Sequence, residues 1–170
     1  MTEPFLIRGA TPADVTFMAR MLVEANHGLD TRPRPTVPEL LHEPMIGRFL
    51  VGWGRPGDTG VIAVRPDGVR CGAAWYRLLT ADEPGWVYLD DATPELTIAV
   101  TTRARGRGVG TALMAALIER ARSEGRPGVT LSVSLGNPVA LALYRRAGFQ
   151  SLSEGHGWAT MVWRPTPAGT

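Results

Sequence analysis

The chain has 170 residues and a net charge of +2, and hydrophobic residues make up 44% of it. This composition is typical of a globular domain with its own core and excludes a disordered chain. All 18 basic residues are arginine, which excludes a lysine Schiff base and the lysine of a phosphate-binding P-loop. The single cysteine, Cys71, excludes an internal disulfide.

Other binding classes are also disfavoured. His27, His42 and His156 are widely spaced and form no metal-ligand pattern, so no metal site is expected. The balanced charge argues against nucleic acid as a partner, and an apolar run such as residues 113–118 is too short to cross a membrane. Because no export signal is visible, we expect a cytoplasmic protein.

Hydrophobic periodicity in the first third predicts one strand and two helical stretches. Residues 5–8 form the expected strand. Thr11 caps the first helix, which ends near Gly28. Residues 37–50 form the second stretch, and Pro44 interrupts it because proline cannot donate a backbone hydrogen bond.

The middle of the chain predicts a hairpin followed by a crossover unit. Residues 61–65 and 69–79 flank a Pro-Asp-Gly turn and form the hairpin. Strands at residues 95–100 and 129–135 are separated by a glycine-rich loop and a helix at residues 109–124. A connection of this length joins parallel neighbours in a sheet.

The last third predicts a helix and two closing strands. Asn137 caps the helix, which ends near Gly148, and the strands lie at residues 149–152 and 158–163. The full order is β-α-α-β-β-β-α-β-α-β-β. It predicts an α/β (α+β) fold in which about four helices flank a mixed sheet of about six or seven strands.

The strongest chemical signal is the loop at residues 103–110, which follows a strand and opens a helix. Its glycines allow a tight turn, and its arginines and the free N–H groups of the helix start favour an anion such as a diphosphate. A dinucleotide fingerprint would require glycine where Thr111 stands. The residues alone leave two readings, a diphosphate site of another type or a solvated glycine-rich turn.

Two motifs in the second half resemble those of one enzyme family. Arg105-Gly-Arg-Gly-Val-Gly110 resembles the Gln/Arg-x-x-Gly-x-Gly/Ala signature of the GCN5-related N-acetyltransferases, the GNAT superfamily. Residues 137–149 resemble the family segment Asn-x-x-Ala-x-x-Leu-Tyr-x-x-x-Gly-Phe. The resemblance extends over residues 5–164 and implies a single GNAT domain with a splayed central sheet, followed by a loose tail at residues 165–170.

The resemblance implies that acetyl-CoA is the acyl donor and that no metal takes part. It places the pantetheine arm against Ile98, Ala99 and Val100, at the end of a splayed strand. The positions that match the diphosphate loop and helix start are Arg105, Gly106, Arg107, Gly108, Val109, Gly110 and Thr111. Asn137 resembles a polar residue that contacts the cofactor, although its position before a proline also suits a helix cap.

Tyr144 resembles the tyrosine that protonates the departing CoA thiolate in this family. A phenol keeps its proton at neutral pH and can serve in this way, and the alternative is an aromatic anchor of the last helix. An attacking ammonium must also lose a proton, and Glu95 is our first candidate for the base. Asp90 and Asp91 come next. The alternative is that these are solvated acids and that, as in some family members, no side chain acts as the base.

The acceptor site is the least determined part. Residues 81–95 combine five acids with Trp86 and Tyr88, and they form either a rim that attracts a cationic amine or a solubilising loop. Residues 31–36 are expected to form the other rim. Cys71 is expected to be a structural thiol, because nothing nearby would lower its pKa.

The resemblance therefore implies transfer of an acetyl group from acetyl-CoA to a primary amine by direct attack in a ternary complex. The acceptor would be a small molecule or a peptide. The alternatives are an O-acyl or longer-chain acyltransferase and a non-catalytic CoA-binding sensor domain. Family members often form dimers, and residues 158–163 could pair as an edge strand in a homodimer.

Overall fold

The computed structural model describes residues 4–27 and 31–167. Their element order is the expected one, except that Pro44 divides the second helical stretch into two short helices. The last residues of the tail expected at 165–170 lie outside the described residues. The strands are β1 Leu6–Gly9, β2 Thr59–Val64, β3 Arg70–Arg77, β4 Glu95–Val100, β5 Val129–Ser134, β6 Gln150–Gly155 and β7 Trp158–Trp163. The helices are α1 Val15–His27, α2 Val37–His42, α3 Pro44–Gly47, α4 Val109–Ser123 and α5 Pro138–Arg146, with 3₁₀ turns η1 Pro12–Asp14 and η2 Thr102–Ala104.

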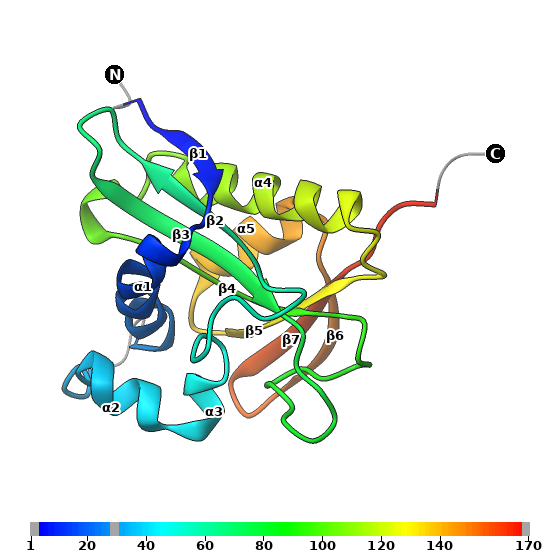
Figure 1. Ribbon diagram of the computed structural model, residues 1–170. Coiled ribbons are helices and arrows are strands. Elements are labelled where there is room, and N and C mark those ends of the chain that lie inside the picture. The colour runs from blue at the N-terminus through cyan, green and yellow to red at the C-terminus, as the bar shows by residue number, and fades with distance from the viewer. Residues whose placement is uncertain (1–3, 28–30, 168–170) are drawn as a thin grey trace.

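The strands form one mixed sheet with helices on both faces (Figure 1). Its order is β1-β2-β3-β4-β5-β7-β6. Alternate residues of a strand face opposite sides, so Ala73 and Trp75 pack in the core beneath α1, while Ala74 and Tyr76 pack in the core beneath α4. No helix of the described residues has both the length and the apolar character needed to cross a membrane.

The parallel neighbours β4 and β5 separate almost at once. β4 pairs with β3 over its whole length, from Glu95 opposite Arg77 to Val100 opposite Gly72. On its other side, β4 pairs with β5 only at Glu95 opposite Thr130. The expectation of a splayed sheet with these two strands as parallel neighbours is confirmed.

The place expected for the last strand is corrected by the structure. β7 lies between β5 and β6 and pairs with both, so it is not an edge strand. The edge is β6, and all its residues are exposed. A short turn connects β6 to β7, and the inner position falls to β7, whose side chains Met161, Val162 and Trp163 are apolar and buried.

A buried ion pair, which the sequence did not reveal, connects β3 to the chain between α3 and β2. Arg77 is 1% exposed and donates from Nε and Nη2 to the two carboxylate oxygens of Asp58, at 2.9 and 2.7 Å. Its Nη1 donates to the carbonyl oxygens of Arg48 and Val51. This bonding satisfies a charge that would otherwise be costly to bury, and it fixes the segment after α3 against the sheet.

Candidate functional site

A cavity of about 770 Å³ opens where β4 and β5 separate. Residues from both faces of the sheet line it, including Leu22 of α1 and Tyr144 of α5. Glu95 and Ile98 of β4 and Ser132 of β5 lie between them. Because the gap between the strands joins the two faces, groups that approach from opposite sides can meet in it.

The backbone of β4 presents polar groups to this gap. The N–H of Thr101 donates to the carbonyl of Cys71, and in an antiparallel pair every second residue bonds to the same partner. Ala99 and Thr97 therefore direct their N–H and C=O groups toward β3, while Ile98 and Val100 direct theirs toward the side where β5 has moved away. Of the three positions expected to meet pantetheine, Ile98 and Val100 face the gap through their backbone, and Ala99 does not.

The start of α4 is open to an anion. Gly108 is its N-cap with φ 81°, and no side chain caps the helix. Gly106 also has a left-handed φ, of 72°, so both positions favour glycine. The first N–H groups of a helix have no partner within it, which leaves those of Val109, Gly110 and Thr111 for a bound group.

The side chains of Arg105 and Arg107, the two arginines of the signature at residues 105–110, are engaged away from the start of α4. Arg105 donates from Nε to the carbonyl of Val100 at 3.2 Å and from Nη2 to Glu24 of α1 at 3.2 Å. It therefore braces the loop against β4 and α1. Arg107 lines a second cavity on the β3 side of the loop.

Asn137 is a helix cap. Its side-chain oxygen accepts from the N–H of Ala140 at 3.1 Å at the start of α5. The capping interpretation is therefore what the structure shows, and a contact of Asn137 with a cofactor stays a prediction.

Glu95 is a buried carboxylate in the wall of the cavity. It is 3% exposed and accepts from the N–H groups of Trp86 at 3.2 Å and Val87 at 3.1 Å. Burial raises the pKa of this carboxyl to about 7, although the Val87 and Trp86 N–H groups lower it in part. A carboxyl with a pKa near 7 can both accept and release a proton at neutral pH, as a general base requires.

Gly85 is a positioning residue that sequence reasoning missed. A Cβ on Gly85 would lie 1.9 Å from Oε2 of Glu95 and 2.8 Å from Leu79. Only glycine lets the chain pass this close and direct its next N–H groups at the carboxylate. The available signal was the Pro84-Gly85 pair directly before Trp86, a turn that folds back on β4.

Tyr144 is a buried phenol that reaches the same cavity from α5. It is 8% exposed, and its ring contacts that of Phe149 with centroids 6.0 Å apart. Burial raises the pKa of the Tyr144 phenol to about 12, so it stays protonated at neutral pH. The position agrees with both expected roles, since the ring anchors α5 while the residue lines the cavity.

The other acids of residues 81–95 stay outside the cavity. Asp90 is exposed, and the Thr93 hydroxyl and Ala92 N–H hold the pKa of its carboxyl below the usual value. Asp91 accepts from the Tyr88 hydroxyl at 2.6 Å. From this segment only Trp86 and Glu95 line the cavity.

Of the remaining candidates, Cys71 is buried and lies near the Ala63 carbonyl, in keeping with a structural thiol. His27, at the end of α1, lines the cavity between β4 and β5. Within the described ranges no group of His, Cys, Asp or Glu side chains could hold a metal ion.

Comparison with known proteins gives the family. Residues 21–149 match the family model of the acetyltransferase (GNAT) family. The chain belongs to this family. The membership supports an acyltransferase enzyme, and it agrees with the resemblance seen in the two sequence motifs.

Among curated GNAT relatives, the L-methionine sulfoximine/L-methionine sulfone acetyltransferase of Pseudomonas aeruginosa is 40% identical over 58 residues, which are 34% of this chain and 34% of that protein. The mycothiol acetyltransferase of Arthrobacter sp. is 29% identical over 115 residues, which are 68% of this chain and 34% of that protein. The chain thus matches about a third of the length of these relatives.

The GNAT fold is also seen in solved structures. A GNAT superfamily phosphinothricin acetyltransferase from Sinorhizobium meliloti, solved in complex with AcCoA, aligns with a TM-score of 0.63 at 23% identity. The alignment covers 96% of this chain and 89% of that one. The residues around the gap fit such a cofactor, because the uncapped N–H groups of α4 suit a diphosphate and the alternating polar groups of β4 suit the amides of pantetheine.

Proposed function

We propose that this GNAT protein transfers an acetyl group from acetyl-CoA to a primary amine, by direct attack in a ternary complex. One observation carries the proposal. A buried carboxylate whose pKa is about 7, Glu95, and a protonated buried phenol, Tyr144, line one cavity at the place where β4 and β5 separate. The first can take a proton and the second can give one.

The donor would be held by backbone groups. The N–H groups of Val109, Gly110 and Thr111 would bind the diphosphate, and the backbone of Ile98 and Val100 would bind the pantetheine arm. When bound there, acetyl-CoA supplies a thioester carbonyl that an amine can attack. The N–H groups of β4 that face the gap are suited to hold the oxygen on which negative charge develops.

Glu95 and Tyr144 would divide the proton transfers between the two faces of the sheet. Strand alternation places Glu95 with Ala99 on the α1 face, where an acceptor can enter. There the carboxylate would take a proton from the ammonium. Tyr144 lies on the α5 side and would hold its proton at Oη until the thiolate departs.

The lining favours a small amine with an apolar body. On the α1 side the cavity wall is mostly apolar, with Leu22, Leu40, Phe49 and Trp86. Arg32 adds a cationic group that a carboxylate on the acceptor could meet. The names of the curated relatives contain methionine sulfoximine, methionine sulfone and mycothiol, which are small molecules, and this supports a small-molecule acceptor.

The test is release of free CoA thiol from acetyl-CoA in the presence of an amine panel that includes L-methionine sulfone and peptides with a free N-terminus. We expect turnover with at least one amine and a loss of about 10²-fold or more in kcat/KM for Glu95→Gln. A matched set of alcohols tests O-acyl transfer, and longer acyl-CoA donors test chain length. Stabilisation by acetyl-CoA in a thermal melt without turnover of any acceptor would instead support the sensor alternative.

A further inference from the structure

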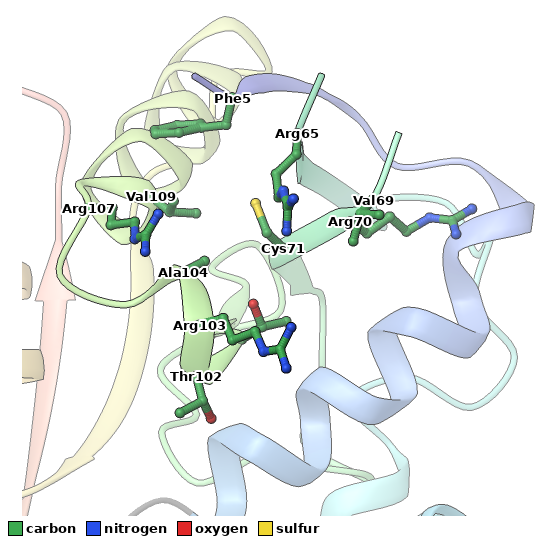
Figure 2. Close-up of a pocket in the computed structure, with 11 residues that line it drawn as sticks. Phe5, Arg65, Val69, Arg70, Cys71, Thr102, Arg103, Ala104, Arg107 and Val109 are labelled. Atoms are coloured by element: carbon green, nitrogen blue, oxygen red, sulfur yellow. The ribbon is translucent and has the colours of Figure 1, made fainter. Parts of the chain in front are cut away.

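A second cavity, of about 570 Å³, lies on the β3 side of the loop that leads into α4. Phe5 before β1, the β2–β3 hairpin and residues 101–109 enclose it. Figure 2 shows Arg65 of the β2–β3 hairpin and Arg103 and Arg107 of the loop before α4 around one opening. No residue of β5 or α5 lines it, and it shares no lining residue with the cavity between β4 and β5. Arg107 and Val109 belong to the loop expected to hold the diphosphate, and their side chains line this cavity on the β3 side of that loop.

The lining carries positive charge without acids of its own. Four arginines belong to it, and no acidic residue of the described ranges does. Arg70 extends away from the opening in Figure 2 and donates to the buried Asp14 at 2.6 Å. Arg65 pairs with Asp67 of the hairpin turn at 2.7 Å. These carboxylates offset part of the charge of Arg65 and Arg70, but they lie outside the lining, so an anion inside the cavity would approach guanidinium groups before it approached an acid.

The floor of this cavity is apolar. Cys71, Ala104 and Val109 are buried there, at 3%, 8% and 3% exposed, and Phe5 closes one side. The volume is within the range of small-molecule sites and far exceeds what one inorganic ion fills. Guanidinium groups match the oxygens of a phosphate in bidentate geometry, and several of them suit a dianion better than a carboxylate.

We propose that this cavity binds a phosphate monoester of a small organic molecule, at a site separate from the gap between β4 and β5. The phosphate lies among Arg65, Arg103 and Arg107, and the organic part lies on the apolar floor. The inference does not depend on the acetyl transfer proposed above, because binding at this site requires neither acetyl-CoA nor an acceptor.

The experiment is isothermal titration of the purified chain with phenyl phosphate at low salt, with phenol as the uncharged comparison. We expect saturable binding of phenyl phosphate and none of phenol. Val69 lines the cavity and is 51% exposed, so it accepts a charge without a cost to the core. Val69→Glu should weaken phenyl phosphate binding at least about tenfold. Glutamine has the size of glutamate but no charge, so the Kd of Val69→Gln should stay within about twofold of the wild-type value.

A second arm separates this cavity from the cofactor site. Arg65→Gln should weaken binding severalfold, and Arg55→Gln, an exposed arginine near the opposite end of β2, should not. Phenyl phosphate should still bind when acetyl-CoA is saturating. Its apparent Kd should reach a limit as the acetyl-CoA concentration is raised, whereas two ligands that shared one site would give an apparent Kd that rises in proportion to that concentration. Three results would each overturn the proposal. They are an apparent Kd that rises in proportion to the acetyl-CoA concentration, equal binding by the two Val69 variants, and no binding at about 10 mM phenyl phosphate, which corresponds to about the weakest affinity this titration resolves.

Discussion

Replacement of Glu95 by glutamine should stabilise the protein more at high pH than at low pH. Between its ordinary pKa of 4.5 and the folded value of about 7, the unfolded chain has lost the Glu95 proton while the folded chain keeps it. Unfolding then releases a proton, so this group makes the wild type less stable as pH rises. At about 1.4 kcal/mol per unit, the contribution between pH 5 and pH 8 is roughly 2.5 kcal/mol.

Glutamine does not titrate, so Glu95→Gln lacks this contribution. The loss of one acceptor for the Trp86 or Val87 N–H adds an offset that does not depend on pH. The informative quantity is therefore the change in the melting-temperature difference between variant and wild type. Between pH 5 and pH 8 the melting temperature of Glu95→Gln should rise relative to that of the wild type by roughly 5–10 °C for a chain of this size.

The assay is a thermal melt of both proteins at the two pH values, with Glu154→Gln of the exposed strand β6 as the matched control. Glu154→Gln should show no such movement. The same titration should appear in the rate, so that kcat/KM of the wild type is half-maximal near pH 7 and reaches a plateau above about pH 8, whereas Glu95→Gln lacks that rise. A melting difference for Glu95→Gln that is the same at both pH values would refute the reasoning that Glu95 is buried with a raised pKa.

Three further variants test the site and its support. Gly85→Ala would place a Cβ 1.9 Å from the Glu95 carboxylate. We expect kcat/KM to fall at least about tenfold, while the affinity for acetyl-CoA, measured by titration, stays unchanged. The control is Gly155→Ala, where a Cβ meets open space, and it should change neither quantity. Tyr144→Phe should lower kcat in the thiol-release assay by about 10²-fold with little loss of stability, and an unchanged kcat would remove the tyrosine from the mechanism. Arg77→Met would leave Asp58 buried without its partner, and denaturant unfolding should show a loss of about 3–5 kcal/mol; a loss below about 1 kcal/mol would contradict the structural role of this ion pair.

The sequence by itself determined the elements and most of their order. Apolar periodicity predicted strand β4 and helix α4 to within a residue of their bounds. Alternation in a strand and the 3.6-residue repeat of a helix depend only on neighbouring residues, so both can be seen in the sequence. The length of the crossover between β4 and β5 made those strands parallel neighbours. The glycines of the loop before α4 were informative because left-handed backbone at Gly106 and Gly108 is a local requirement.

Tertiary structure decided what depends on segments far apart in the chain. A strand pattern does not say which neighbours a strand takes, so only the folded sheet shows β7 inside and β6 at the edge. The bonding of Arg105 to Glu24 joins residues that periodicity cannot connect. The pKa of Glu95 likewise depends on desolvation beneath the turn at Gly85, because burial is set by what packs over a residue and not by the residue itself.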